Sequence, residues 1–303
     1  MAGSSQSRRR RDREVALASL PVMNAVAVVT DSTAYLPEGV AETSAVSVVP
    51  LHVVLGSRTG NEGSEVSPQD VASALAERRL QVSTSRPTPA EFAEVYRSTG
   101  ATRIVSVHLS AELSGTYDAA VLAAAEVEAE GIEVRVVDSA TIAMGLGFAV
   151  LAAARAAAAG GGLDEVADAA REVAAVTDVL FYVDTLEHLR RGGRIGAAAA
   201  LVGTALAVKP LLHVAGGRIA PLEKVRTASK ALARLEELAV DRAGDGPVDV
   251  AVHHLAAGEK AQALADRLLE RIPGLDSVHV SEVGAVVGAH VGPGLLGVVV
   301  SRR

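Results

Sequence analysis

Residues 103–139 have the pattern of a strand, a helix and a second strand: RIVSVHLSAELSGTYDAAVLAAAEVEAEGIEVRVVDS. The apolar runs 103–109 and 133–139 are typical of buried strands, and the Ala-rich segment 114–131 is typical of a helix closed by Gly131. Strands that alternate with helices at this spacing favour a parallel sheet. The stretch therefore predicts an α/β fold.

The same alternation extends along the N-terminal half. Ser67 and Pro68 begin a helix, because Ser is a common N-cap and Pro fits the first helical position. Pro50 marks an edge or a bend within an apolar run. The predicted elements are strands at 25–30 and 47–56, a helix at 67–80, a loop at 82–92 that feeds a helix from Thr88-Pro89, and a helix from about 141 to 159.

The C-terminal half mixes hairpins with crossover helices, which favours an α+β domain with a mixed sheet. Residues 209–227 are predicted to form a hairpin that turns at Gly216-Gly217. The other predicted elements are strands at 179–185, 248–255, 277–284 and 294–302, a helix at 228–243, and a basic turn at 189–196.

The chain is predicted to form two domains. Residues 1–24 are expected to be a disordered basic tail, with an export signal as the alternative. Residues 25–160 are expected to form a parallel-sheet α/β domain, and residues 161–303 a C-terminal α+β domain. Gly160–Gly162 is the predicted linker, and the chain is allowed to cross between the domains more than once.

Composition narrows the classes of function. Only 2% of the residues are aromatic against 49% hydrophobic, so a cavity would have aliphatic walls that suit an alkyl chain. The net charge of −7 argues against a general nucleic-acid binder. The absence of Cys excludes disulfides and thiolate chemistry and fits a reducing cytoplasm, the predicted location.

Hydroxyl side chains follow several predicted strands, where parallel α/β sheets bind ligands. Together with backbone N–H groups at helix N-termini, they make a seat for an anion. Ser and Thr are also the usual helix N-caps, so local capping is the alternative. The positions assigned to this wider pocket are Ser32, Ser85, Gly115, Thr116 and Ser139.

Catalytic motifs are weak in this sequence. Ser114 lacks the leading Gly of a Gly-x-Ser-x-Gly elbow, although Ser114, His290 and Asp31 leave a hydrolase triad open. No Walker sequence is present, and His253-His254 on a strand would face opposite sides, so no nucleotide site and no metal site are predicted. His290 lies among glycines (284–294) and is a candidate carboxylate donor.

Nine segments in order resemble the DegV family from about residue 26 to 301. They are VVTDSTAYLP (28–37), VSVVPLHVVLG (46–56), TSRPTPAEF (84–92), VHLSAELSGTYDAA (107–120), VVDSATIAMGLG (136–147), YVDTLEHLRRGGRIG (182–196), KPLL (209–212), EKVRT (223–227) and GAHVGPGLLGV (288–298). Arg86 stands where the family often has Gln, and Tyr35 where it often has Asp or Ala.

The resemblance implies a two-domain carrier that buries a long-chain fatty acid and presents its carboxylate to a separate fatty acid kinase for acyl-phosphate formation. It implies that Thr84, Ser114 and His290 contact the carboxylate. Arg194 and Arg226 are candidates for kinase docking or for assisting phosphoryl transfer. The chain would then be no enzyme by itself, would need no cofactor besides the bound lipid, and would touch membranes transiently for lipid exchange. A hydrolase acting alone through Ser114 and His290, or a sensor, remain the alternatives.

Overall fold

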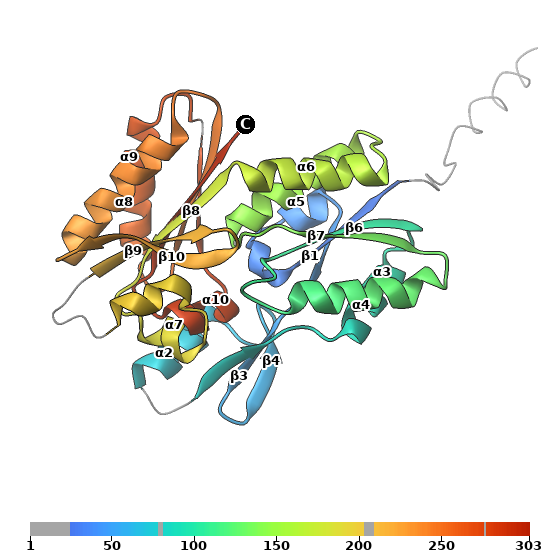
Figure 1. The fold of residues 1–303 in the computed structure, drawn as a ribbon, viewed down its shortest axis with the longest axis horizontal. Helices are drawn as coiled ribbons and strands as arrows, with labels where there is room; N and C mark the ends of the chain where they lie inside the picture. The colour runs from blue at the N-terminus through green and yellow to red at the C-terminus, as the bar shows by residue number, and fades with distance from the viewer. Residues whose placement is uncertain (1–24, 78–80, 203–208, 276) are drawn as a thin grey trace, which may run out of the picture.

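The computed structural model describes residues 25–303 apart from 78–80, 203–208 and 276 (Figure 1). The predicted tail at 1–24 lies outside the described residues. The strand–helix–strand prediction for 103–139 is confirmed as β6 (Arg103–His108), α4 (Thr116–Glu128) and β7 (Glu133–Asp138). β6 and β7 pair in parallel, with Ile104 opposite Val134.

These strands belong to a four-stranded parallel sheet with the order β2-β1-β6-β7. Its other strands are β1 (Ala27–Asp31) and β2 (Val46–Val49). Successive side chains of a strand point to opposite faces, so each face packs against its own pair of helices. Val29 packs with α3 (Pro89–Ser98) and α4 on one face, and Val28 packs with α5 (Met144–Ala158) and α6 (Leu163–Ala175) on the other.

The second large sheet has six strands in the order β10-β9-β8-β13-β11-β12. Only the β11–β12 pair is parallel, so the sheet is mixed, as predicted. Helices α8 (Ala228–Ala243) and α9 (Gly258–Arg271) cover one face (Figure 1). The strands are β8 (Thr177–Tyr182), β9 (Lys209–Ala215), β10 (Arg218–Val225), β11 (Val248–His254), β12 (Val278–Glu282) and β13 (Leu296–Arg302).

Helix α5 lies between the two large sheets. Leu146 packs with the parallel sheet, whereas Met144 and Phe148 pack with Val179 and Val299 of the mixed sheet. A helix that meets protein on both sides must be apolar all round, which explains its Ala-rich sequence. Gly160–Gly162 joins α5 to α6, and these two helices pack together, so this glycine run is an interhelical turn.

The expectation of one strand over 47–56 was wrong. Pro50 has no N–H to donate, and the chain leaves the parallel sheet there. It re-forms as β3 (His52–Leu55) in a separate antiparallel sheet with β4 (Arg58–Asn61) and β5 (Val82–Ser85). Residues 82–85, predicted to be loop, are therefore strand, because they pair with β3.

Short elements surround the small sheet and complete the chain. The predicted turn at 189–196 begins as α7 (Glu187–Arg191), and the glycine-rich stretch 284–294 contains α10 (Ala285–Val291). Helix α10 packs against α2 (Pro68–Glu77) and α7. The remaining elements are η1 (Ser32–Ala34), α1 (Val40–Thr43) and η2 (Gly196–Leu201). Among the described helices, none has the length and apolarity needed to cross a membrane.

Candidate functional site

An apolar cavity lies where α10, the small sheet and the inner face of the mixed sheet meet. It contains about 910 Å³ of space free of protein atoms, and part of that space is open solvent at the mouth. Its walls are mostly aliphatic and include Leu109, Leu113, Ile142, Val179, Val287 and Val299.

Thr84 and His290 form one polar contact on the cavity wall. Thr84 is brought there by β5, and His290 by α10. The Oγ1 of Thr84 lies 2.9 Å from the Nε2 of His290, and both residues line the cavity. Two of the three predicted carboxylate contacts therefore meet directly.

His290 is held neutral at pH 7. Burial, together with the positive charge of Arg194, lowers the pKa of His290 to about 4. Its Nδ1 is buried without a hydrogen-bond partner among the described residues, on a ring that packs against the backbone of Gly192. An unpaired buried N–H is rarer than an unpaired acceptor, which favours the proton on Nε2. Nε2 then donates to Thr84, and the Thr84 hydroxyl hydrogen stays free for a ligand.

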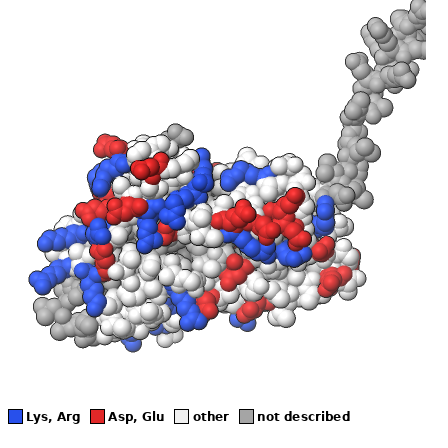
Figure 2. Space-filling model, turned by 45° about the horizontal axis from the view of Figure 1, so that its top comes forward, with Lys and Arg blue, Asp and Glu red and all other residues white. Residues whose placement is uncertain are grey.

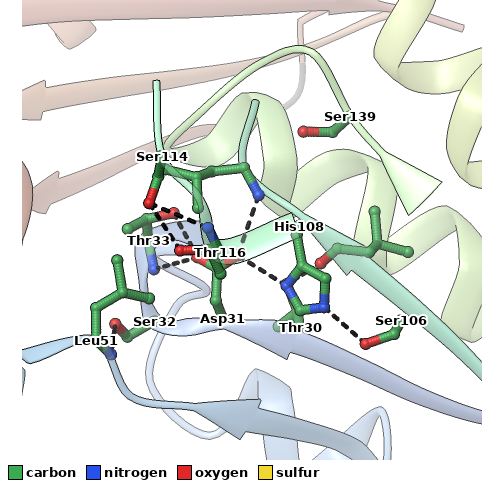
Figure 3. Close-up of polar contacts among 12 residues, drawn as sticks. Thr30, Asp31, Ser32, Thr33, Leu51, Ser106, His108, Ser114, Thr116 and Ser139 are labelled. Atoms are coloured by element: carbon green, nitrogen blue, oxygen red, sulfur yellow. Dashed lines mark hydrogen bonds and ion pairs between the residues drawn. The ribbon is translucent and has the colours of Figure 1, made fainter. Parts of the chain in front are cut away.

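Ser114, just before α4, is like Thr84 in that its hydroxyl is bonded to a polar group behind it. Its Oγ lies 2.8 Å from the Oγ1 of Thr116, and it accepts from the backbone N–H of Thr116 at 3.3 Å (Figure 3). Thr116 is fully buried, whereas Ser114 lines the cavity. When the Thr116 hydroxyl donates to the Ser114 oxygen, the hydroxyl hydrogen of Ser114 is free to bond a ligand in the cavity.

Two arginines add positive charge to this polar end. Arg194 lines the cavity and donates through Nε to the carbonyl of Leu113 at 3.1 Å and through Nη1 to Gly192 at 2.6 Å. Arg86 also lines it, on the loop after β5. Arg194 is thus part of the cavity wall, whereas Arg226 is exposed in the turn before α8 and does not line the cavity.

The wider hydroxyl set does not converge on one point. Ser85 lines the cavity, and Gly115 and Thr116 lie directly behind Ser114. Ser32 instead bonds to the carboxylate of Glu62 and to the backbone N–H of Leu51. Ser139 is buried beside a second, polar hollow and accepts from the backbone N–H of Thr141 at 3.3 Å. Local bonding, the alternative noted from the sequence, thus describes Ser32 and Ser139.

A buried polar chain at the end of β1 has the composition of a catalytic triad. The Nδ1 of His108 lies 3.0 Å from Asp31, and its Nε2 lies 2.7 Å from Ser106 (Figure 3). All three side chains are fully buried, and Ser106 is bonded to Tyr96 behind it. No substrate can reach Ser106, so this buried group of hydrogen-bonded side chains links β1 to β6. Asp31 bonds to His108 and not to His290, so the hydrolase triad of Asp31, Ser114 and His290 that the sequence left open does not form.

Glu62 and Tyr35 are functional neighbours that the sequence did not reveal. The Glu62 carboxylate accepts from the Tyr35 hydroxyl at 3.1 Å and from the Val286 N–H of α10 at 2.8 Å. Burial raises the pKa of Glu62. The pair fixes the start of the helix that carries His290. The unusual Tyr35 was the one available signal.

Charges of both signs are interspersed over the face shown in Figure 2. In the described part of the chain, no three His, Asp or Glu side chains are grouped so as to hold a metal ion. The cavity itself offers hydroxyl, imidazole and guanidinium groups, which are donors suited to an anion.

Comparison with known proteins agrees with this architecture. A family model described as "Uncharacterised protein, DegV family COG1307" matches residues 25–303. The DegV domain-containing protein SCO2569 of Streptomyces coelicolor is 65% identical over 281 residues, covering 92% of this chain and 99% of that protein.

Two solved structures are also similar. One is described as fatty acid binding of a DegV family protein from Thermus thermophilus, with a TM-score of 0.86 and 33% identity over 92% of this chain and 100% of that one. The other is described as DegV, a fatty acid binding protein from Bacillus subtilis, with a TM-score of 0.85, 33% identity and the same coverage of both chains.

Proposed function

This chain belongs to the DegV family, and on that premise we propose that it binds a long-chain fatty acid in the apolar cavity. The carboxylate is held by Thr84, Ser114 and His290. The observation that carries the proposal is the Thr84–His290 contact on the wall of a mostly aliphatic cavity. The fatty acids named for the two structural relatives support the choice of ligand.

The energetics suit an acyl chain. Burial of a chain of about sixteen carbons at about 0.8 kcal/mol per methylene supplies on the order of 10 kcal/mol before the costs of ordering. An unpaired carboxylate in such a cavity would cost several kcal/mol. The two hydroxyl hydrogens inferred at Thr84 and Ser114 offset that cost, because each hydroxyl has a second polar group behind it.

The acyl chain would run from this polar end along the aliphatic wall. Val179 and Val299, on the central strands β8 and β13, line the cavity and pack beneath α5. These residues offer only methyl groups. A ligand with a single polar end therefore fits this cavity better than one that is polar throughout.

We further propose that the chain is a carrier and not itself a catalyst. It presents the carboxylate to a separate fatty acid kinase, which forms the acyl phosphate, and it exchanges lipid during transient contact with membranes. Support comes from Ser114, whose hydroxyl is bonded to Thr116, and from His290, whose Nδ1 has no carboxylate partner in the described part of the chain. A serine hydrolase needs that base and its orienting acid.

Mass spectrometry of an organic extract of the purified protein tests the first step. A fatty acid is expected in stoichiometric amount, and delipidated protein should rebind it. An empty protein that fails to bind fatty acids and turns over acyl esters would reverse the assignment. Addition of a fatty acid kinase and ATP, with the acyl phosphate trapped as its hydroxamate, tests the second step.

A further inference from the structure

The polar end of the cavity carries two arginines that have no acidic partner. Arg86 and Arg194 both line the cavity, and neither forms an ion pair with any residue in the described ranges. Several other arginines are paired with acids: Arg97 and Arg234, for example, each hold two carboxylates. Two uncompensated guanidinium groups at one opening in a protein of net charge −7 call for an anionic ligand.

Arg86 reaches this position from β5, two residues after Thr84. Its guanidinium lies over the backbone of Gly115, and a Cβ added at Gly115 would overlap its Nη1. The side chain is exposed and forms no hydrogen bond within the described part of the chain. Its donors are therefore free to turn toward a ligand beside Ser114.

Arg194 lies in the turn after α7, and two hydrogen bonds to backbone carbonyls fix its side chain. Its bonds to Leu113 and Gly192 use two of the five N–H donors that a guanidinium offers. The remaining donors and the whole positive charge stay beside the Thr84–His290 contact. The guanidinium of Arg194 is thus held in place, whereas that of Arg86 is free to reorient.

The start of α4 adds to the positive potential. This helix has 13 residues, its N-cap Gly115 has no side chain, and the amide of its first residue, Thr116, donates to the Ser114 hydroxyl at 3.3 Å. Uncapped amides at a helix N-terminus favour negative charge. The contact at Gly115 therefore places the N-terminus of α4 beside the guanidinium of Arg86.

A carboxylate carries one negative charge and neutralises only half of the charge of the two guanidinium groups. A phosphate monoester carries about −1.5 to −2 near pH 7 and accepts bidentate bonds from arginine. We propose that Arg86 is a specificity-determining residue which, with Arg194, makes the cavity prefer an acyl chain with a phosphate head over the same chain with a carboxylate. This inference rests on the proposed fatty-acid site and deepens it.

Calorimetric titration of the delipidated full chain with hexadecyl phosphate and with hexadecanoate tests the preference. Wild-type protein is expected to bind the phosphate about tenfold more tightly. Arg86→Gln should lower the phosphate affinity about fivefold and the carboxylate affinity less than about twofold, because an exposed pair contributes at most about 1 kcal/mol. Gly115→Ala should act in the same direction, since it displaces the Arg86 side chain.

Arg155→Gln is the matched control, because Arg155 is exposed on α5 without an ion pair in the described part of the chain. It should leave both affinities and their ratio unchanged. Equal losses for both probes in Arg86→Gln, or no loss, would overturn the role of Arg86 while hexadecanoate binding upholds the proposed function. Failure of the wild type to bind either probe would remove both.

Discussion

The Oγ1 of Thr84 lies 2.9 Å from the Nε2 of His290, although 206 residues separate them in the sequence. A strand of the small sheet supplies one partner and a helix near the C-terminus supplies the other. With the proton on Nε2, as inferred from the unpaired Nδ1, the imidazole donates to Thr84 and leaves the Thr84 hydroxyl hydrogen free for a ligand.

Thr84→Val should lower the affinity for hexadecanoate about tenfold. Valine keeps the shape of threonine but removes the hydroxyl, and a hydrogen bond to a charged group contributes about 1.5–3 kcal/mol. Titration calorimetry measures the change. Thr43→Val is the control, because the exposed Thr43 hydroxyl bonds only to carbonyls of its own turn. Equal affinity of Thr84→Val and wild type would remove Thr84 from the site.

Gly192→Ala should weaken fatty-acid binding although the substitution itself removes no polar side chain. A Cβ there would overlap the Nδ1 of His290, so the imidazole must shift from Thr84. The expected loss of affinity is about tenfold or more, since displaced hydrogen-bond partners are left unsatisfied. Gly246→Ala is the matched control, because a Cβ at Gly246 meets nothing within 4 Å. Unchanged binding by Gly192→Ala would show that the position of the imidazole is unimportant.

Stability should rise as the pH increases from about 4 to 6.5. Burial lowers the pKa of His290 to about 4, below that of the unfolded chain, so the unfolded state binds more protons in this interval. The contribution is up to about 3 kcal/mol, at 1.36 kcal/mol per pH unit. Above pH 6.5 this contribution is complete, and it is lost as the pH falls to about 4.

Urea unfolding of wild type and His290→Gln at several pH values measures this contribution. The difference between the two proteins isolates His290, because His253, whose burial also lowers its pKa to about 4, and Glu62 are present in both. The free energy of unfolding should depend less steeply on pH in the variant. Parallel pH profiles would contradict a buried neutral imidazole at position 290.

Ile142→Phe should change which lipid is retained. Ile142 lines the cavity and is only partly buried, so a larger side chain takes space from the acyl chain. Mass spectrometry of extracted lipid should show shorter chains or lower occupancy. Leu122→Phe, on the 62% exposed position of α4, should leave the lipid profile as in wild type. Identical lipid in Ile142→Phe would place the acyl chain elsewhere.

Arg226→Ala should leave fatty-acid binding unchanged but lower the rate at which a kinase phosphorylates the bound fatty acid. Arg226 is exposed and does not line the cavity, so hexadecanoate affinity should equal that of wild type. Formation of acyl phosphate with a fatty acid kinase should fall severalfold if this side chain docks the partner. Arg155→Ala is the control for loss of one surface charge. A kinase rate equal to that of wild type would remove Arg226 from the docking surface.

Much of the fold follows from local pattern. In the run 103–139, β6 is predicted because its residues are buried on both faces, whereas the edge strand β7 is only partly buried and is predicted from its valines. Helix α5 is predicted from an apolar sequence that reflects its packing against two sheets. The small sheet was missed for a physical reason. Its strand β5 (VSTS) has little apolar content, and it is ordered by pairing with β3, whose Val53 lies opposite Thr84.

The candidate site was predicted less evenly. The ends of parallel strands locate polar residues at one edge, but they do not fix where each side chain points. Ser32 turns to Glu62, and Ser139 turns to Thr141, whereas Ser114 reaches the cavity. Thr84 and His290 lie outside the parallel sheet altogether. Strand order did not locate them: the glycine-rich stretch suggested His290, and the family resemblance suggested both residues as carboxylate contacts.

Strand β13 occupies the middle of the six-stranded sheet, between β8 and β11, and contributes Val298 and Val299 to the cavity wall. A nascent chain can fold its parallel sheet early, because those strands end at residue 138. The cavity wall has to wait for residues 296–302. Under the proposed function, lipid loading would therefore be a late event in folding, because a ribosome-bound chain whose first half alone is folded lacks the strand that completes the cavity wall.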